Sequence, residues 1–275
     1  GAVGGAACLY TMAALCIAIA RGRQGWRELA RWRAMHPAYL WLCGLLFVVY
    51  EIFLSVAVGL AHDRSQAMEI GVINYLWPSL TIAFAVLWRQ QSARWWLWPG
   101  LLICLWGLVR VLGGDSFSLT TLWQHVQGNP AAYGMAFAAA LLWPTYSLLA
   151  RRYGAGFNAV GLFVTWTALA LWVQWLRQDA VAPMQWSWPT ALQLFMAGAL
   201  TALGYSCWEH GIQHGKLAVL AAASYFTPVL SALAASLLLQ VLPGWRFWPG
   251  VALVTAGSLL CSWAPRAPAP PPAKQ

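Results

Sequence analysis

Nine long apolar blocks set the strongest limit on how this chain can fold. A helix rises 1.5 Å per residue, so roughly 20 apolar residues cross the hydrocarbon core of a bilayer, which is about 30 Å thick. Hydrophobic residues make up 61% of the 275 residues and charged residues 8%, whereas roughly a quarter of a soluble domain is charged. The sequence therefore predicts a polytopic membrane protein. We place its spans at 2–20, 37–60, 66–88, 95–112, 131–150, 158–176, 190–213, 217–241 and 247–264.

The blocks predict an all-α bundle. Strands of a membrane barrel would alternate apolar and polar residues over segments of about ten residues, whereas these blocks are continuously apolar. The longest interior loop, 113–129, is too short to fold alone, so we expect one helical membrane domain. Residues 265–275 are rich in proline, and we expect a disordered cytoplasmic tail there.

Basic residues fall mainly in alternate loops. Five arginines follow the first span, and twelve of the sixteen basic residues lie on the same side of the predicted spans. This asymmetry is typical of the cytoplasmic face of a membrane protein. It places the C-terminus in the cytoplasm and explains the net charge of +9 without nucleic-acid binding. We expect a multi-pass protein of the bacterial inner membrane.

Enzyme signatures are missing from the sequence. It contains no HExxH, GxSxG or glycine-rich phosphate loop. The six cysteines all fall inside predicted spans, where they read as inert thiols rather than disulfides or metal ligands. We expect no catalytic residue, metal or cofactor, and a monomer whose partners are membrane lipid and a small-molecule substrate. An intramembrane hydrolase and a passive channel remain alternatives.

The two halves of the chain repeat each other. A shift of 150 residues aligns NYLWPSL with SYFTPVL, and Trp98-Pro99-Gly100 with Trp248-Pro249-Gly250. A shift of 157 aligns the first span with the sixth, which leaves 131–150 without a partner. We therefore expect a ten-helix protein of two inverted five-helix repeats, with a first helix preceding Gly1. The repeats would cover 1–112 and 131–264, an arrangement common in secondary transporters.

The stretches HDRSQAMEIGVINYLWPSLT and AASYFTPVLS, with the paired WPG helix starts, resemble the EamA-type branch of the drug/metabolite transporter superfamily. Within this branch the chain is most similar to the YddG-type aromatic amino acid exporters of bacteria. The resemblance implies two inverted five-helix repeats, cytoplasmic termini, and export of aromatic amino acids and some amphiphilic compounds.

Residues at membrane depth are the candidates for a substrate cavity. Glu51 is acidic near the middle of a span, where a charge is costly and so commonly functional. It could carry a proton, bind a substrate ammonium group, or be a hydrogen-bonded structural element. Glu209 lies nearer the cytoplasmic end, while Glu69 and His62 are expected to be solvated near the outer interface. The candidate cavity residues are Tyr50, Glu51, Asn74, Tyr75, Trp77, Pro78, Trp143, Tyr146, Tyr205, Ser224, Tyr225 and Pro228.

Each kind of candidate also has a simpler reading. Deep aromatic rings could be ordinary core, and Asn74 and Ser224 could join helices rather than touch substrate. Mid-span prolines kink a helix, either as static packing features or as gates. Tryptophans at span ends are expected to form the interfacial belt. They are Trp95, Trp96, Trp98, Trp186, Trp188, Trp245, Trp248 and Trp263.

The function that the sequence favours is a secondary transporter that exports aromatic amino acids by alternating access. A carrier of the same fold for other amino acids, purines or drugs is the alternative. Proton coupling, exchange and facilitated diffusion remain open.

Overall fold

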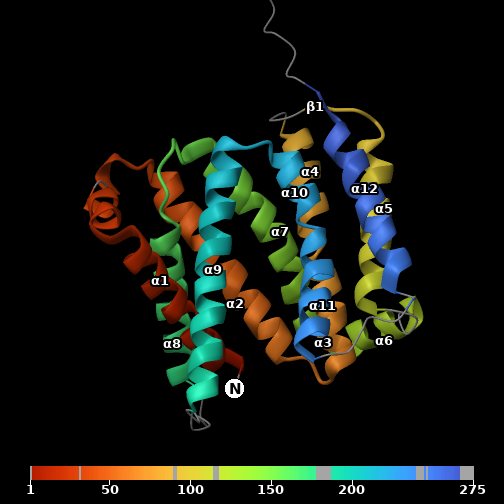
Figure 1. Ribbon diagram of the computed structural model, residues 1–275, viewed down its shortest axis with the longest axis horizontal. Helices are drawn as coiled ribbons and strands as arrows, with labels where there is room; N and C mark the ends of the chain where they lie inside the picture. Colours follow the sequence, from red (N-terminus) through yellow and green to blue (C-terminus); the bar gives the residue numbers. More distant parts are fainter. Residues whose placement is uncertain are drawn as a thin grey trace, which may run out of the picture. The chain divides into compact units, whose positions relative to one another are not determined.

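The computed structural model describes residues 2–30, 32–88, 92–113, 118–177, 187–239, 245 and 247–266. These residues form helices almost throughout (Figure 1). In the first part of the chain the elements are α1 (Ala2–Ala30), the 3₁₀ helix η1 (Trp32–Ala34), the π-helix η2 (Ala38–Cys43), α2 (Gly44–Gly59), α3 (Arg64–Asn74), α4 (Trp77–Leu87), β1 (Ser92–Ala93) and α5 (Leu97–Gly113). They continue with α6 (Leu119–Gly128), α7 (Pro130–Tyr153), α8 (Val160–Leu176), α9 (Trp188–His214), α10 (Leu217–Ala223), α11 (Phe226–Leu239), α12 (Phe247–Trp263) and β2 (Pro265–Arg266).

Five helical segments are long and apolar enough to cross a membrane. They are Val3–Gly22, Ala38–Gly59, Ser65–Leu87, Pro130–Tyr153 and Trp188–His214. Shorter apolar helices at Leu97–Val111, Val160–Leu176, Val219–Leu230 and Trp248–Cys261 occupy the other four predicted blocks. The prediction of a helical, multi-pass membrane protein is therefore confirmed.

The helices group into two compact units. Unit 1 consists of residues 1–74 and 125–215, and unit 2 consists of residues 75–124 and 216–275. Each unit thus combines segments from the two halves of the chain. In unit 1, α1 packs against α8 and α9, and α2 packs against α7 and α8.

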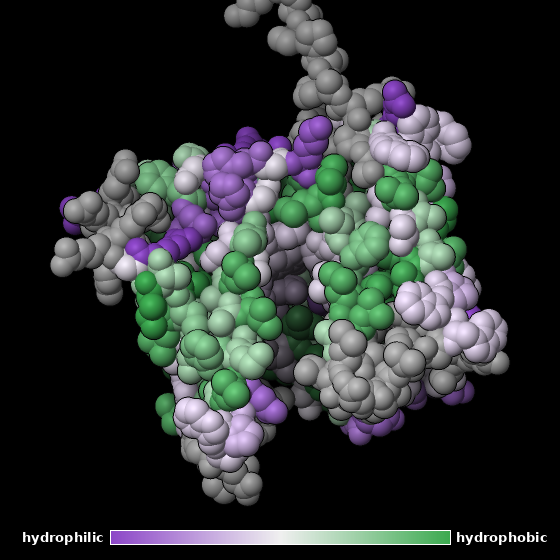
Figure 2. Space-filling model, viewed as in Figure 1, coloured by the Kyte–Doolittle hydropathy of each residue, from purple (hydrophilic) through white to green (hydrophobic). Residues whose placement is uncertain are grey.

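The outer face of α9 is suited to lipid. Figure 2 shows apolar side chains along this helix and hydrophilic colour at one of its ends. Leu192, Phe195, Met196, Leu200 and Leu203 are each at least half exposed on α9, whereas its last turn exposes His210 and His214. An apolar surface of this length that ends in polar residues fits a lipid-facing helix.

In unit 2, α5 and α12 lie side by side and run antiparallel (Figure 1). A Cβ atom at Gly107 would lie 2.7 Å from the backbone nitrogen of Val254, and one at Gly257 would lie 2.7 Å from that of Cys104. These glycines let two backbones approach closely, as small residues do in membrane helix pairs. Around them lies a core that includes Leu101, Leu108 and Tyr225.

Two of the predicted spans are broken helices. The span at 66–88 divides into α3 and α4 around Tyr75 and Leu76, and the span at 217–241 divides into α10 and α11 around Ser224 and Tyr225. A proline within a continuous helix removes a hydrogen bond and clashes with the preceding turn. Here Pro78 instead lies in the first turn of α4, and Pro228 is the third residue of α11. The first turn tolerates proline because its amide has no intrahelical acceptor, so the expected mid-helix kink is corrected to a break.

The beginning of the predicted tail is ordered. Pro265 and Arg266 form β2, which pairs antiparallel with β1, and the Arg94 amide donates to the Ala264 carbonyl. The remainder of the predicted tail lies outside the described residues.

Candidate functional site

Glu51 lies buried in α2, with 2% of its surface exposed. The hydroxyl of Tyr10, from α1, donates to its Oε2 atom, and the hydroxyl of Tyr205, from α9, donates to its Oε1 atom. The two hydroxyl oxygens are 3.3 Å apart. Three helices of unit 1 therefore meet at this carboxylate, which lies near the middle of the membrane-length segment Ala38–Gly59.

Aromatic rings surround the carboxylate. Tyr50 lies 4.7 Å from Trp143 between ring centroids, and Tyr205 lies 5.1 Å from Phe47 and 5.8 Å from Trp143. Such separations allow stacked and edge-to-face contacts. We call this group the aromatic cluster; its members are Tyr10, Phe47, Tyr50, Trp143, Tyr205 and Trp208.

The Glu51 carboxylate retains capacity to accept further hydrogen bonds. An ionised carboxylate accepts about four hydrogen bonds, and two hydroxyls donate to this one. Among the described residues no Lys, Arg or His forms an ion pair with Glu51, while the ion pair of Glu69 is with His125. A buried carboxylate is stabilised by a cation, and the faces of aromatic rings also attract cations.

Glu209 forms a second buried carboxylate site in unit 1. It is 0% exposed, in α9, one turn beyond Tyr205. Tyr146 donates to its Oε2 atom at 2.5 Å, while Tyr39 and Gln213 donate to its Oε1 atom at 2.6 and 2.7 Å. The Tyr39 hydroxyl also accepts from the Ala159 amide at 3.0 Å. This dense network joins η2, α7 and α9 and reads as a structural clamp.

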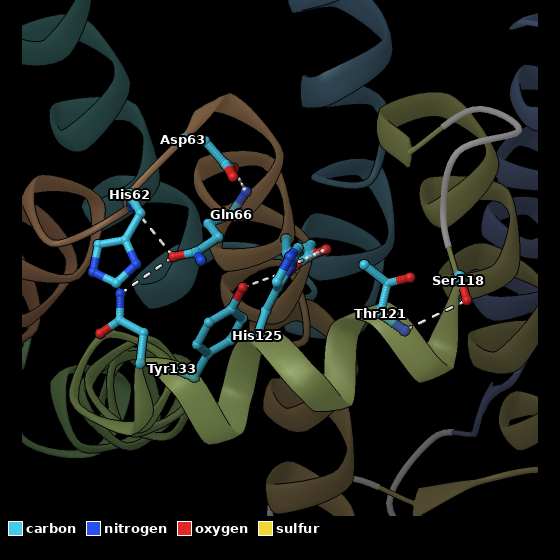
Figure 3. A network of polar contacts seen from close by, with 9 residues as sticks. His62, Asp63, Gln66, Ser118, Thr121, His125 and Tyr133 are labelled. Carbon is cyan, nitrogen blue, oxygen red and sulfur yellow. Dashed lines mark hydrogen bonds and ion pairs between the residues drawn. The ribbon is translucent and has the colours of Figure 1, made fainter.

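A third network lies where α3 meets α6 and α7 (Figure 3). Glu69 pairs with His125 Nδ1 at 3.0 Å and accepts from the Tyr133 hydroxyl. Glu69 is 7% exposed, so the expectation that it is solvated is wrong, whereas His62 is exposed as expected. The carboxylate is buried because helices distant in sequence cover it, which local hydropathy does not reveal.

Backbone caps support the Glu69 network (Figure 3). Asp63 accepts from the Gln66 amide and so caps the first turn of α3. The Asn129 side chain donates to the Leu60 carbonyl and to the Gln66 side chain. It also accepts from the Ala132 amide at the start of α7. These bonds fix the end of α2 and the starts of α3 and α7 together.

The predicted cavity residues fall into both units. Unit 1 brings Tyr50, Glu51, Trp143, Tyr146 and Tyr205 together, with Tyr146 joining the aromatic cluster to the Glu209 network. Asn74 also lies in unit 1, at the end of α3. The other predicted cavity residues lie in unit 2 and are Tyr75, Trp77, Pro78, Ser224, Tyr225 and Pro228.

In unit 2 the polar groups bond both between helices and within one helix. Tyr225 is fully buried and hydrogen-bonds to Ser79, and Tyr75 packs against the same core. The Ser224 hydroxyl donates to the Leu220 carbonyl one turn earlier, at 2.9 Å. Thr81 does the same with the Trp77 carbonyl.

Asn74 ends α3 in unit 1. It is 9% exposed, and its carboxamide oxygen is buried without a hydrogen-bond partner among the described residues. Leaving a buried acceptor unpaired costs about 1–3 kcal/mol, so this atom is suited to receive a hydrogen bond from a ligand.

The aromatic residues assigned to the interfacial belt are exposed. Trp95, Trp188 and Trp245 are 74%, 82% and 74% exposed. Trp96 is the exception, because it packs partly against the core of unit 2 beneath Arg94. Trp186 lies outside the described residues.

Sequence reasoning missed several members of the sites. Tyr10, Phe47 and Trp208 belong to the aromatic cluster, and Tyr39 completes the Glu209 network. Tyr10 and Phe47 do lie within predicted spans at membrane depth, which was an available signal. Their approach to Glu51 and Tyr205 depends on helix packing, which no local pattern encodes.

The described helices and their buried polar sites define a multi-pass helical membrane protein with buried carboxylates inside one of its units. Comparison with known proteins identifies the family. Residues 130–263 match the EamA-like transporter family. The chain is 40% identical to the aromatic amino acid exporter YddG of Salmonella typhimurium over 97% of this chain and 89% of that protein. The chain therefore belongs to the EamA-type branch of the drug/metabolite transporter superfamily, in its YddG-type group, and the resemblance read from the sequence is confirmed.

Other relatives agree. The exporter of the same name from Escherichia coli is 39% identical over the same shares of the two chains. The one from Ancylobacter novellus is 28% identical over 72% of this chain and 66% of that protein. A solved crystal structure matches with a TM-score of 0.76 over 96% of this chain and 89% of that chain, at 24% identity, which shows a shared fold.

Proposed function

We propose that this protein is a carrier of the bacterial inner membrane that exports aromatic amino acids by alternating access. One observation carries the proposal, namely that Glu51 lies at mid-span within the aromatic cluster and has no basic partner among the described residues. The exporter relatives at 39–40% identity support the same substrate class.

The proposed binding mode divides the substrate between two kinds of partner. Its ammonium group pairs with Glu51, which would otherwise be a buried charge without a cation. Its ring packs among the rings of the aromatic cluster, where each ring pair contributes about 0.5–1.5 kcal/mol beyond area burial. Asn74 is a further candidate contact because its carboxamide oxygen accepts no bond within the described chain.

We propose an inverted repeat as the framework of the carrier. The sequence repeat relates α1 to α8 and α5 to α12. Within each of these two pairs, the two helices also pack against each other. Between α5 and α12 the contacts repeat with the 150-residue shift, because Gly100 faces Gly257 just as Gly250 faces Gly107. The Cys104 thiol also lies 3.8 Å from the carbonyl of its own repeat equivalent, Val254. Such self-matching, antiparallel contacts support a two-fold axis between the repeats.

The breaks at Tyr75–Leu76 and Ser224–Tyr225 are proposed as the flexible points of transport. They lie 149 residues apart in the sequence, and the prolines that follow them, Pro78 and Pro228, lie 150 residues apart. Interrupted helices are typical of substrate sites in carriers, because unwound backbone can bend and offers free polar groups. In this proposal Pro78 and Pro228 belong to the first turns of the rigid helices that follow the breaks, α4 and α11.

Counterflow in proteoliposomes tests the function. Vesicles with purified protein and unlabelled phenylalanine inside should take up labelled phenylalanine from outside, saturably and above protein-free vesicles. Uptake of labelled purine or an aliphatic amino acid without phenylalanine uptake would favour the alternative carrier. Flux that rises linearly without saturation would indicate a channel.

The role of Glu51 is tested in the same vesicles. If Glu51 pairs with the substrate ammonium, Glu51→Gln should weaken substrate binding at every pH. If instead it carries the coupling proton, the variant should lose the response to a pH gradient while exchange continues. Unchanged transport with unchanged pH dependence would show that Glu51 is structural.

A further inference from the structure

Three membrane-length segments of unit 1 meet at one end of this unit. Val3–Gly22 ends there, Ala38–Gly59 begins there, and Pro130–Tyr153 ends there. The Arg21 side chain, near the end of the first segment, donates at 2.8 Å to the carbonyl of Asn158, in the loop after the third segment. The ends of membrane-spanning segments lie at the level of the lipid headgroups.

Tyr153 joins the start of the second segment to the end of the third. Its ring stacks on that of His36 with 4.6 Å between centroids, and the Arg152 guanidinium carbon lies 5.4 Å from the same Tyr153 centroid. Close to His36 in the chain, the Arg33 guanidinium carbon lies 5.2 Å from the centroid of the Trp32 ring. We call this group the Tyr153 site; its members are Trp32, Arg33, His36, Arg152 and the half-buried Tyr153, and the first four are exposed.

The donors of the Tyr153 site suit a phosphate group. A guanidinium group that lies over an aromatic face keeps its N–H groups at its own edge, and this planar fork matches two phosphate oxygens. His36 adds a further donor, because its Nδ1 atom accepts from the Ala38 amide at 3.2 Å. This bond places the proton of the neutral imidazole on Nε2. Two guanidinium groups and an imidazole N–H thus gather at the headgroup level.

The charge at this end of unit 1 is strongly positive. Residues 21–36 contain five arginines and one acidic residue, Glu28. Arg151 donates to the carbonyls of Ile212 and Gly215, so the end of α7 lies beside the end of α9, where Figure 2 shows hydrophilic colour. A cluster of basic residues directly after a membrane span attracts anionic lipids.

Exposed apolar side chains continue along the same segments. Ile19, beside Arg21 in the first segment, is 79% exposed, and Trp41 and Leu45 in the second are 61% and 59% exposed. Acyl chains can pack against such side chains, whereas a free anion gains nothing from them. The surroundings of the Tyr153 site therefore favour a lipid over a soluble anion.

We propose that the Tyr153 site binds the phosphate of an anionic phospholipid. Arg33 and Arg152 pair with the phosphate oxygens, and His36 donates through Nε2. Trp32 lies at the boundary between headgroups and acyl chains, where tryptophan is enriched. The inference goes beyond the proposed function, since it concerns a lipid partner and not the exported substrate.

Lipid competition with the complete protein tests the inference. The purified protein is immobilised in a neutral detergent and binds radiolabelled phosphatidylglycerol, against which unlabelled phosphatidylglycerol and phosphatidylcholine with the same acyl chains compete separately. We expect phosphatidylcholine to require at least about a tenfold higher concentration, since each basic residue near the headgroups contributes a factor of about five. Equal competition by the two lipids would overturn the inference.

Variants assign the lipid to the Tyr153 site. Arg33→Gln and Arg152→Gln should each raise the dissociation constant of phosphatidylglycerol about fivefold, and the double variant at least about tenfold. Arg152→Lys should recover part of this loss, because it keeps the charge without the planar fork. Lys216→Gln is the matched control, since Lys216 is an exposed cation outside the site, in a loop that we also assign to the cytoplasm. An equal loss in the control and the double variant would contradict the assignment.

Inorganic phosphate distinguishes a lipid site from a site for a free anion. Phosphate in large excess should displace no more phosphatidylglycerol than chloride of equal ionic strength, which screens charges to the same extent. Displacement by phosphate and not by chloride would reject the lipid as the occupant. These measurements require no transport, so a failure of amino acid export in counterflow leaves their outcome unaffected. The competition with the unaltered protein decides the inference even if a variant fails to fold.

Discussion

At the scale of single residues, Glu51 and Glu209 are two buried carboxylates with different surroundings. Both accept from tyrosine hydroxyls, but Glu209 also accepts from Gln213 and is 0% exposed. Glu51 lies among the rings of the aromatic cluster, with two donors. Glu209 thus has the contacts of a structural group, while Glu51 retains acceptor capacity for a ligand.

Glu209→Ala should destabilise the protein by about 2 kcal/mol, because the buried Tyr146 hydroxyl loses its acceptor and a cavity remains. Tyr39 is affected less, since its hydroxyl can still donate to the Phe157 carbonyl. Thermal unfolding in detergent measures the effect. His210→Ala, at the exposed neighbouring position, should leave the melting temperature unchanged. Equal melting temperatures for Glu209→Ala and the native chain would show that the hydrogen bonds to Glu209 do not contribute to the stability of the protein.

Asn74→Ala should raise the apparent substrate constant about threefold to tenfold, because a buried acceptor proposed to contact the substrate is removed. Trp95→Ala is the comparison, since Trp95 is exposed at a helix end and should change transport little. Initial rates of counterflow at several phenylalanine concentrations give the constants. A larger effect at Trp95 would reject Asn74 as a substrate contact.

At the scale of elements, the close approach of α5 and α12 depends on glycine. Gly107→Ala and Gly257→Ala each place a methyl group 2.7 Å from a backbone nitrogen of the facing helix. Neither backbone can move away without separating the pair, so each variant should destabilise unit 2 by about 1–3 kcal/mol.

Gly134→Ala and Gly204→Ala are matched controls for the glycine variants. Both positions lie within helices, and a Cβ atom there would meet nothing within 4 Å. Their melting temperatures should equal or slightly exceed that of the native chain, because alanine favours helix more than glycine does. A similar loss for all four variants would mean that helix packing at Gly107 and Gly257 is not the cause.

The broken helices show where element-level prediction from sequence stops. Hydropathy marks 66–88 and 217–241 as continuous apolar blocks, and both do contain helices. Pro78 and Pro228 signal an irregularity, yet a proline is compatible with a kink inside a helix or with the first turn of a new one. Which of these forms depends on neighbouring helices that can satisfy the freed backbone groups.

At the scale of the whole molecule, the charge asymmetry predicts orientation. Arg152 is exposed at the end of α7 and belongs to a loop that we assign to the cytoplasm. Thr120 is exposed in α6, which precedes α7 in the chain, so we assign it to the opposite side of the membrane. In a background where native cysteines do not react, Arg152→Cys should react with a membrane-impermeant maleimide only in inverted vesicles. Thr120→Cys should react in intact cells. The reverse pattern would invert the proposed topology, and labelling of both from one side would contradict a single crossing by α7.

The sequence by itself determined the class of protein, the family and the candidate carboxylate. Hydropathy, loop charge and the 150-residue repeat are properties of local composition and order, so they survive without coordinates. Glu51, Tyr50 and Trp143 could be chosen as candidates because the apolar block around each of them places it at membrane depth.

Tertiary structure alone decided which hydroxyls bind the Glu51 carboxylate, since Tyr10 and Tyr205 lie 41 and 154 residues from Glu51 in the chain. It also decided that Glu69 and Glu209 are buried, because burial depends on which helices pack over a side chain, and hydropathy along one helix does not specify its neighbours.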